Sequence, residues 1–504
     1  MVWLFAAVAV AESCEDPRAQ RHLDAGLHAL SARDAEDALA AFRRCDDVGS
    51  ECSTCREYLA YVYGQREEWG MAAMAWDSLS GTPYGEAARE QVERYRMANP
   101  HPAVEGGLRV PLQGDSARFQ AYDPHPTAPE DTFDIDVASP KSVRFLSRGT
   151  KVYVNALEGL KTLVYDPSGP SRLGEIHHVF TEADQELFGG QQTVFGYPYR
   201  RSSPSGDPNQ FAGKPVEMAL SHQDRWLWIP YYRRDFDIGA GSPSAVAIVD
   251  TETDTIVRVL PTGPIPKYVA ISPDDRWASI THWGDNTVAL IDISSGDPSQ
   301  FSYRHERLVV EYVLDQSSLL ESHRDSACGF CLRGTVFGPE GQLWVARMGG
   351  DGGIAGFDVE TGRYLGTVDG IPANPRHLLQ RGDVLYTTSS RSGQVSRVSR
   401  AEVASKLAAA DGGRIALEGV RTVHVGAGAR TVDITPDGSA LYVAVNARSQ
   451  VVKLDAETLQ IQGRWRVDAH PVGLAVSPDG TQVWVTSQAN RGRGGNAITV
   501  LPVQ

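Results

Sequence analysis

The sequence predicts a small all-α region at residues 12–100 followed by a large all-β region at residues 132–504. Residues 19–97 are rich in Ala, Glu and Arg, and their apolar residues recur at helical spacing. From residue 132 onward, short runs with alternating apolar and polar residues recur between turn-forming Pro, Asp and Gly residues. The chain also contains 49 glycines in 504 residues, as expected where many tight turns join many short strands.

The first eleven residues, MVWLFAAVAVA, form an uninterrupted apolar run that is followed by a polar segment. Ala9-Val10-Ala11 has the small-x-small form that signal peptidase accepts, so we expect residues 1–11 to be a signal peptide. The run lacks a basic segment before it, which leaves a truncated start or a short buried helix as the alternative. A signal peptide would place the protein in the periplasm or outside the cell. No transmembrane span is expected after residue 11, because no later run of 18 apolar residues exists.

The helical region repeats itself at an offset of 34 residues. The offset pairs small or aromatic positions with one another: Gly26 with Ala60, Ala29 with Tyr63, Ala38 with Ala72, Phe42 with Trp76, and Cys45 with Leu79. Small residues let two antiparallel helices approach closely, and the aromatic residues fill the space between successive pairs. This period and pattern resemble the tetratricopeptide (TPR) repeat, although Ala29 and His22 stand where Tyr and Trp are usual.

Two functions are open for this TPR-like helical region. The resemblance implies peptide binding in a concave groove, but two repeats form little groove, so packing against the second domain is the other possibility. Residues 84–98 are predicted to form a polar capping helix. Residues 101–131 are rich in Pro, Gly and polar residues and are expected to be a linker with one short strand at residues 108–112.

The repeated unit of the β region is clearest in three places. Segments that open at Pro266, Ala429 and Pro471 each run through a strand into Ser/Thr-Pro-Asp followed by Asp or Gly. An alternating strand, a polar turn and further strands follow each of them. Pro fixes φ, Asp hydrogen-bonds the local backbone and Gly accepts a positive φ, so these residues predict the turn between the first two strands.

These copies resemble the YVTN-type β-propeller repeat family, and the resemblance covers about 370 residues. First strands are expected to open at seven positions: Pro140, Pro215, Pro266, Leu332, Pro375, Ala429 and Pro471. The predicted fold is therefore an all-β seven-bladed β-propeller preceded by a small all-α TPR-like helical domain. The last copy lacks a fourth strand, and Thr132–Val137 is predicted to supply it and close the ring, which removes exposed blade edges.

Six cysteines are consistent with an exported, oxidised protein. Two C-x-x-C pairs lack the following His that covalent haem attachment requires. A zinc site would need these two pairs to meet across two regions, so disulfides are the preferred interpretation, with a redox role for the late pair as an alternative. The four early cysteines allow three pairings that the sequence does not separate. The expected disulfide cysteines are Cys14, Cys45, Cys52, Cys55, Cys328 and Cys331.

One repeat position is strongly cationic. The residue after each opening position is a Lys or Arg in five of the seven copies, whereas 48 basic residues in 504 would place fewer than one there by chance. In a propeller these positions surround one mouth of the central channel, where five cations would concentrate an anionic ligand. The alternative is that their side chains only lie over the rim and pair with acids such as Glu158, Glu217, Asp235 and Asp285. The five residues are Lys141, Lys267, Arg333, Arg376 and Arg430.

Loops that follow the second strands open on the same face and are rich in aromatic, Arg, His and Asn residues. Such side chains suit a pocket for a polar ligand, a sugar or a peptide carboxylate. The alternative is that Tyr231 and Trp283 simply plug the channel. The candidate ligand-binding residues from these loops are Tyr231, Arg233, His282, Trp283 and Asn446.

Enzymatic chemistry has less support from the sequence than binding. No nucleophile elbow, P-loop, zinc-protease or dinucleotide-binding motif is present, so no catalytic residue, metal or cofactor is predicted. A net charge of −15 disfavours nucleic-acid binding. The sequence therefore predicts a monomeric exported binding or scaffold protein whose cationic face engages an anionic or polar ligand or a partner protein. A lactonase-like hydrolase or a redox protein that uses the same face is the alternative.

Overall fold

The structure is a computed structural model of the whole chain. It describes residues 14, 16–32, 34–48, 52–65, 75, 116–121, 131–197, 205–237, 239–316, 319–320, 327–488 and 496–503. The expected signal peptide, the capping helix at 84–98, the strand at 108–112 and the second-repeat residues 72, 76 and 79 lie outside these ranges. Within the described residues, no helix is both long and apolar enough to cross a lipid bilayer.

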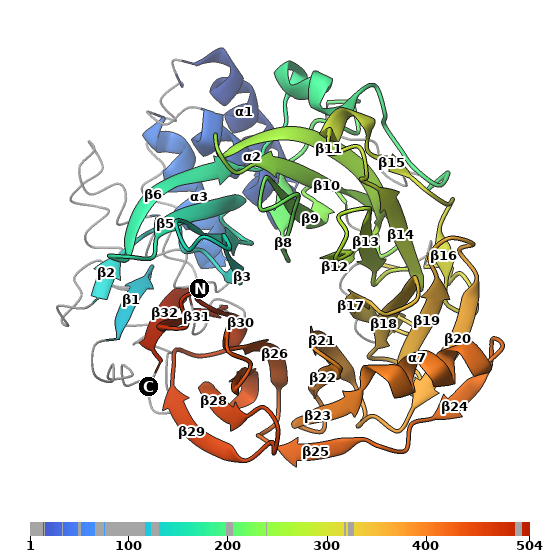
Figure 1. The fold of residues 1–504 in the computed structure, drawn as a ribbon. Helices are drawn as coiled ribbons and strands as arrows, with labels where there is room; N and C mark the ends of the chain where they lie inside the picture. The colour runs from blue at the N-terminus through green and yellow to red at the C-terminus, as the bar shows by residue number, and fades with distance from the viewer. Residues whose placement is uncertain are drawn as a thin grey trace.

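Seven β-sheets are arranged in a ring and form a seven-bladed β-propeller (Figure 1). Blades 1 to 3 contain the following strands: β3 (Pro140–Phe145), β4 (Val152–Ala156), β5 (Lys161–Asp166) and β6 (Ser171–His177) in blade 1; β7 (Gly213–Pro215), β8 (Ala219–Ser221), β9 (Trp226–Arg234), β10 (Pro243–Asp250) and β11 (Thr255–Pro264) in blade 2; and β12 (Pro266–Ile271), β13 (Trp277–His282), β14 (Thr287–Asp292), β15 (Ser302–Tyr303) and β16 (Leu308–Val309) in blade 3.

Blades 4 to 7 follow in chain order around the ring. Their strands are β17 (Leu332–Phe337), β18 (Gln342–Arg347), β19 (Ile354–Asp358), β20 (Tyr364–Asp369) and β24 (Arg414–Ala416) in blade 4; β21 (Pro375–Arg381), β22 (Val384–Ser389), β23 (Gln394–Ser399) and β25 (Arg421–His424) in blade 5; β26 (Ala429–Ile434), β27 (Ala440–Val445), β28 (Gln450–Asp455) and β29 (Ile461–Arg466) in blade 6; and β30 (Pro471–Val476), β31 (Gln482–Ser487) and β32 (Ala497–Pro502) with β1 (Ala117–Gln120) and β2 (Asp131–Phe133) in blade 7. Helix α7 (Arg400–Ala409) lies between β23 and β25.

The predicted opening positions are confirmed in six blades, where each is the first residue of the innermost strand. Blade 2 differs, because Pro215 ends β7 and the inner edge continues as β8. The turns predicted between the first two strands are also formed as expected, with an Asp side chain that hydrogen-bonds the local chain. In the turn after β26, the Thr435 hydroxyl donates to Asp437, which also accepts from the Ser439 amide at 3.0 Å. The turn after β30 repeats this arrangement with Ser477 and Asp479.

The ring is closed by a different strand from the one that the sequence predicts. Strand β1 pairs antiparallel with β32 over Ala117–Gln120, so a segment assigned to the linker at 101–131 completes blade 7. Of the predicted closing segment at 132–137, only the first two residues belong to a strand, β2. This strand pairs parallel with β1 at the outer edge of blade 7. Phe119 anchors the closure, because it is 2% exposed and packs with its ring centroid 4.6 Å from that of Tyr165. Closure by the N-terminal side of the chain is therefore confirmed, but the identity of the strand was wrong.

The described N-terminal helices are α1 (Pro17–Ser31), α2 (Ala35–Val48) and α3 (Ser53–Gln65). Gly26 of α1 faces Phe42 of α2 so closely that a Cβ on Gly26 would lie 2.3 Å from the ring. Phe42 in turn stacks on Tyr58 of α3, with ring centroids 5.0 Å apart. The small and aromatic positions identified in the sequence are thus the residues that pack these three helices together.

The helices pack against the propeller over blade 1 (Figure 1). Arg43 of α2 donates to Glu158 in the β4–β5 turn at 3.1 Å, and Arg44 pairs with Asp235 after β9. Ala138 before β3 belongs to the same apolar cluster as Leu59 of α3. Of the two functions open for this region, packing against the second domain is therefore observed.

Candidate functional site

The five cations occupy equivalent positions because the backbone is the same at the start of each inner strand. In six blades a residue with positive φ directly precedes the opening residue, and an irregularity in strand pairing follows at the cation position. A bulge takes one residue out of the ladder and redirects its side chain. The six residues with positive φ are Ser139, Ile265, Cys331, Asn374, Gly428 and His470.

Neighbouring blades hold this part of the backbone in place. The Thr486 hydroxyl of blade 7 donates to the carbonyl of Lys141 in blade 1 at 2.9 Å. The Thr281 hydroxyl of blade 3 donates in the same way to the carbonyl of Arg333 in blade 4 at 2.8 Å. The Thr388 hydroxyl of blade 5 does the same for Arg430 in blade 6. In blades 2 and 7 the residue at this position is Val216 or Val472, and its carbonyl accepts from Ser142 or Thr431 on the inner strand of the preceding blade. The cation position is thus fixed by hydrogen bonds between blades at five of the seven junctions.

Three arginines at this repeat position lie within electrostatic reach of Lys141. Lys141 is only 9% exposed, and its pKa is lowered well below the ordinary 10.5, first by burial and then by repulsion from Arg430, Arg333 and Arg376. Those three arginines come from blades 6, 4 and 5. Only proximity in the folded ring can bring all of them within electrostatic reach of one lysine in blade 1. We call Lys141, Lys267, Arg333, Arg376 and Arg430 the cationic ring.

Aromatic residues line one side of the cationic ring. The Nζ of Lys267 lies 3.7 Å from the ring centroid of Tyr232 and 5.6 Å from that of Trp283. The guanidinium of Arg333 lies 5.9 Å from the same Trp283 ring. Cation–π contacts of this kind attract a cationic side chain to the face of an aromatic ring.

Polar residues complete the site. The Nζ of Lys141 donates to the Oε1 of Gln488 at 3.1 Å, and Glu217 lies 3.6 Å from Arg333. Of the four acids considered from the sequence, Glu217 therefore pairs with a ring cation. The other three have partners elsewhere in the structure: Glu158 with Arg43 and Lys214, Asp235 with Arg44, and Asp285 with Arg307.

A partly buried Tyr–His pair lies near the same arginines. Tyr268 and His377 follow the cations of blades 3 and 5, and the Tyr268 hydroxyl lies 2.9 Å from the Nε2 of His377. Burial, aided by Arg144, Arg333 and Arg376, lowers the pKa of His377 to about 3. His377 is therefore neutral at physiological pH and adds no charge to the site.

Three of the loop residues proposed from the sequence have structural roles. Tyr231 is fully buried, and its hydroxyl lies 2.9 Å from the Nδ1 of His178 in the core between blades 1 and 2. His282 is also fully buried between the hydroxyls of Thr262 and Thr287, both at 2.8 Å. Asn446 donates to the Pro471 carbonyl at 3.0 Å and so connects blades 6 and 7.

Of the two other loop residues proposed from the sequence, one lies beside the cationic ring and the other does not. Trp283 lies at the cationic ring as predicted, whereas Arg233 donates to the Asp237 carbonyl at 3.3 Å and lies within electrostatic reach of Glu158. Tyr232, which lies over Lys267, is not among the residues predicted from the sequence, whereas its neighbour Tyr231 is. Strand alternation could have identified Tyr232, because a residue on the opposite face of β9 from the buried Tyr231 points toward the mouth.

The disulfides predicted from the cysteine count are present, and the structure selects one of the three early pairings. Cys14 is bonded to Cys52, Cys45 to Cys55, and Cys328 to Cys331. The last of these packs in one apolar cluster with Tyr232 and Trp283, so it lies beside the cationic ring. Cys331 also supplies the positive φ that precedes the inner strand of blade 4.

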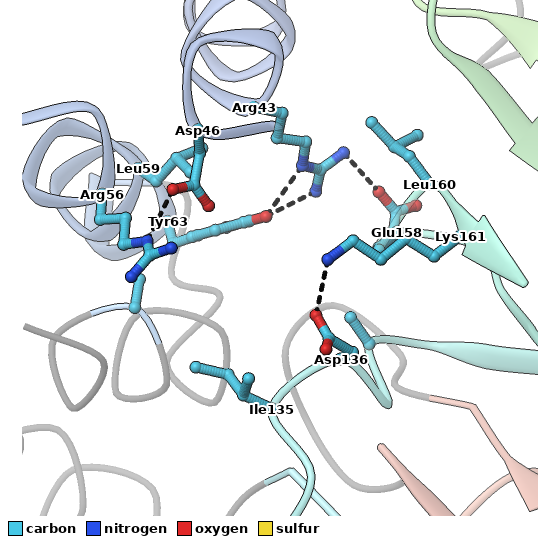
Figure 2. Close-up of a pocket in the computed structure, with 13 residues that line it drawn as sticks. Arg43, Asp46, Arg56, Leu59, Tyr63, Ile135, Asp136, Glu158, Leu160 and Lys161 are labelled. Carbon is cyan, nitrogen blue, oxygen red and sulfur yellow. Dashed lines mark hydrogen bonds and ion pairs between the residues drawn. The ribbon is translucent and has the colours of Figure 1, made fainter. Parts of the chain in front are cut away.

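A hollow lies between the helices and the propeller (Figure 2). It has a volume of about 280 Å³ and is lined by residues of α2, α3 and blade 1. Its charged groups form three ion pairs: Arg43 with Glu158, Arg56 with Asp46 at 2.6 Å, and Lys161 with Asp136 at 2.9 Å. The first pair connects the helices to the propeller, whereas the second lies within the helices and the third lies within the propeller side of the hollow.

No protein-family model matches the sequence, so the resemblances to YVTN-type and TPR repeats stay predictions. No curated protein matches it either. Solved structures do match. Hydrazine synthase from Kuenenia stuttgartiensis is 14% identical over 75% of this chain and all of that chain, with a TM-score of 0.48. The β-propeller domain of Cps50 (Swd1) from Myceliophteria thermophila is 10% identical over 73% of this chain and 97% of that chain, with a TM-score of 0.47. At these identities the similarity concerns the fold alone.

Proposed function

We propose that this chain is a binding protein whose cationic ring holds an anionic ligand that carries carboxylate or phosphate groups. The observation that supports this proposal is the crowding of Lys141 by three arginines from three other blades. Such crowding lowers the stability of the folded state, because like charges lie close together where the protein shields them from water. A bound anion would relieve that repulsion.

The composition of the site favours a polyanion over a singly charged ligand. Five cations occupy this repeat position, and three of the arginines among them lie within electrostatic reach of Lys141. Arginine presents a planar fork of donors that matches carboxylate and phosphate oxygens. The aromatic side formed by Tyr232 and Trp283 offers an apolar surface to the rest of the ligand.

The helical region lies at the same end of the propeller as the cationic ring. Pro140 at the start of β3 pairs with Ala156 at the end of β4, so the β4–β5 turn and the cation of blade 1 share one end of the blade. The helices contact that turn through Arg43. An anionic ligand that forms part of a partner protein would therefore meet both the cationic ring and the side of the helical region.

Enzymatic function on this face has weaker support than binding. A hydrolase would need a base within reach of the cations, and Glu217 and His377 are the groups of that kind in the described site. Burial holds the pKa of His377 at about 3, which makes it a poor proton acceptor at neutral pH. Glu217 already pairs with Arg333. The geometry therefore favours binding over general base catalysis.

Thermal unfolding in low-salt buffer with a graded set of anions tests this function. Citrate and pyrophosphate should raise the unfolding temperature of the native chain more than acetate does, since a ligand that binds the folded state stabilises it. Arg430→Gln on the inner strand of blade 6 should reduce that response by at least tenfold in apparent affinity.

Arg466→Gln, on the exposed outer strand of the same blade, is the matched control and should leave the response unchanged. An equal loss in both variants would show that the anions act through overall charge. No response of the native chain to any polyanion would contradict the proposed function.

A further inference from the structure

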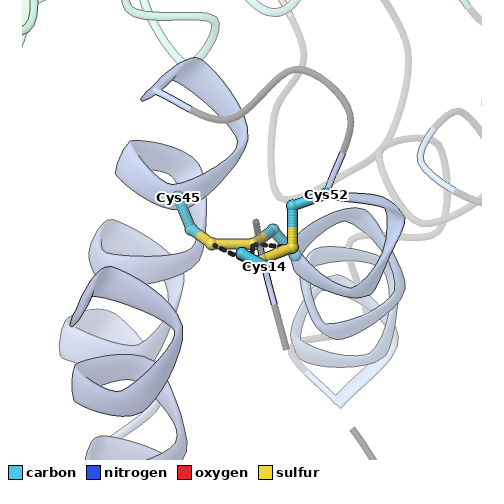
Figure 3. A group of neighbouring side chains, drawn as sticks. Cys14, Cys45 and Cys52 are labelled. Carbon is cyan, nitrogen blue, oxygen red and sulfur yellow. Dashed lines mark hydrogen bonds between the residues drawn. A yellow bond between two sulfur atoms is a disulfide. The ribbon is translucent and has the colours of Figure 1, made fainter. Parts of the chain in front are cut away.

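The four cysteines of the helical region form one cluster of sulfur atoms, beyond the two disulfides that join them (Figure 3). All four Sγ atoms lie within 4.8 Å of one another. Sulfurs that are not bonded to each other are 3.8 Å apart for Cys14 and Cys45, 3.6 Å for Cys14 and Cys55, and 3.4 Å for Cys52 and Cys55. A tetrahedral zinc ion with Zn–S bonds of about 2.3 Å separates its sulfurs by about 3.8 Å.

The backbone already supplies the frame of a four-thiolate site. Cys14 lies just before α1, Cys45 lies near the end of α2, and Cys52 and Cys55 form a C-x-x-C pair at the start of α3. The Cys55 amide donates to the Cys52 carbonyl at 3.1 Å, which forms the tight turn that brings two sulfurs of such a pair to one side. Three separate segments thus converge on one point without a change of fold.

The surroundings suit thiolates as well as disulfides. The helix α1 begins at Pro17 and α3 begins at Ser53, so two helix N-termini lie next to the cluster. The positive end of a helix dipole stabilises nearby thiolates and lowers their pKa. Cys45 and Cys55 are fully buried and Cys14 is 8% exposed, so a metal ion there would be shielded from water and competing ligands.

We infer that Cys14, Cys45, Cys52 and Cys55 bind one zinc ion when their two disulfides are reduced. The oxidised chain fastens its first three helices with two disulfides, and the reduced chain fastens them with a metal ion at the same place. This inference stands apart from the cationic ring and does not depend on the proposed function.

The chemistry balances with a phosphine as reductant. Each disulfide reacts with one phosphine and one water to give two thiols and a phosphine oxide. The four thiols then bind Zn²⁺ and release four protons, because the thiolate is the ligand. Zinc uptake should therefore become stronger as the pH rises.

Zinc analysis of the full chain tests the inference. The protein is reduced with a water-soluble phosphine without oxygen, mixed with excess zinc chloride, passed through a desalting column and analysed by mass spectrometry for bound metal. We expect one zinc per reduced chain and none per oxidised chain. Cobalt in place of zinc should give the visible absorption of a tetrahedral thiolate site.

Two variants assign the metal to these cysteines. Cys328→Ser/Cys331→Ser removes the other C-x-x-C pair and should still bind one zinc. Cys52→Ser/Cys55→Ser should bind none, and circular dichroism checks that it remains folded. If that variant does not fold, Cys14→Ser keeps three ligands and should retain zinc at least tenfold more weakly. No zinc on the reduced native chain, or loss of zinc in the Cys328→Ser/Cys331→Ser variant, would overturn the inference.

Discussion

At the scale of single residues, Lys141 shows most clearly how the fold imposes a charge arrangement that folding alone does not favour. It is 9% exposed and lies within electrostatic reach of three arginines from blades 4, 5 and 6. An apolar side chain of similar length at this position would make the folded state more stable than the buried amine does. The anion binding that we propose would account for a cation at this position.

We predict that Lys141→Met increases the free energy of unfolding by about 1 kcal/mol or more, because it removes a buried charge from among like charges. Folding lowers the pKa of Lys141, so the unfolded chain binds the proton more tightly. The stability of the native chain should therefore rise as the pH increases from that lowered pKa toward 10.5. The variant should lack this rise.

Chemical denaturation over a series of pH values measures both effects. Arg466→Gln, on the outer strand β29, serves as the control and should keep the pH dependence of the native chain. A Lys141→Met variant that is markedly less stable at neutral pH, and still binds polyanions normally, would show that Lys141 is structural.

At the scale of secondary-structure elements, two junctions hold the architecture together: the closing strand β1 and the contact between the helices and blade 1. Strand β1 contributes Arg118, which forms a fully buried ion pair with Asp468 at 3.4 Å. It also contributes Phe119, which packs against Tyr165 and Trp484 and so bridges blades 7 and 1. The closure is thus a packed joint as well as a set of backbone hydrogen bonds.

Phe119→Ala should lower the free energy of unfolding by about 3–5 kcal/mol, the usual cost of emptying a buried aromatic site. Leu173→Ala is a suitable control, because Leu173 is 54% exposed and its loss should change stability by less than about 0.5 kcal/mol. Urea unfolding followed by tryptophan fluorescence measures both. An effect of Phe119→Ala as small as that of the control would mean that β1 does not close the ring.

The helix–propeller contact depends on Glu158, which accepts from Arg43 at 3.1 Å and from Lys214 at 2.9 Å. Although burial alone would raise the pKa of Glu158, Lys214 and Arg43 outweigh burial and hold it well below its ordinary value. The contribution of this carboxylate to stability is thus present above pH 4.5 and is lost as the pH falls further.

Glu158→Gln should cost about 1–3 kcal/mol, less than a fully buried pair because Glu158 keeps 26% of its side-chain exposure. The helical region should also become more sensitive to limited proteolysis. Glu360→Gln removes an exposed carboxylate that lies 3.5 Å from Arg276 and 3.7 Å from Arg304, and it should have no such effect. Equal proteolysis of the two variants would mean that Glu158 does not hold the helices in place.

Most of the propeller can be predicted from the sequence, because its geometry is repeated in the chain. The opening residues Pro266, Ala429 and Pro471 share a turn motif, so their equivalence is visible before folding, and with it the cation position. Strand β1 could not be predicted in this way. It is only four residues long, lacks the repeat motif, and is defined by its partner β32 at the other end of the chain.

The parts of the site that could not be predicted depend on contacts between distant segments. Tyr231 and Tyr232 are adjacent aromatics and both are buried, and only the fold shows which of them packs against His178 and which lies over Lys267. The four early cysteines likewise appear as scattered residues until three helices bring their sulfurs together. In both cases the sequence supplies the residue types and the fold supplies the geometry.

At the scale of the whole molecule, buried neutral histidines should make the fold sensitive to acid. Burial lowers the pKa of His178, His282 and His377 to about 3, whereas the ordinary value is 6.5. The unfolded chain therefore binds these protons more readily below pH 6.5. The neutral histidines therefore cost no stability above pH 6.5, and the free energy of unfolding should fall steadily as the pH decreases from 6.5 to 3.

Urea unfolding at intervals between pH 8 and pH 4 measures this dependence. The midpoint should shift to lower urea concentration below about pH 6.5, because protons bind more tightly to the three histidines in the unfolded chain than in the folded chain. A midpoint that stays constant from pH 7 to pH 4 would contradict the burial of these histidines as neutral groups.

We propose that cations from several blades of the propeller form a single anion site. Crystals soaked in selenate test it most directly, because the selenium atom gives an anomalous signal that locates the anion. We expect a peak within hydrogen-bond distance of Lys141 Nζ and at least two arginines of the cationic ring. Selenate peaks only at exposed arginines on the outer strands, with none at the mouth, would contradict it.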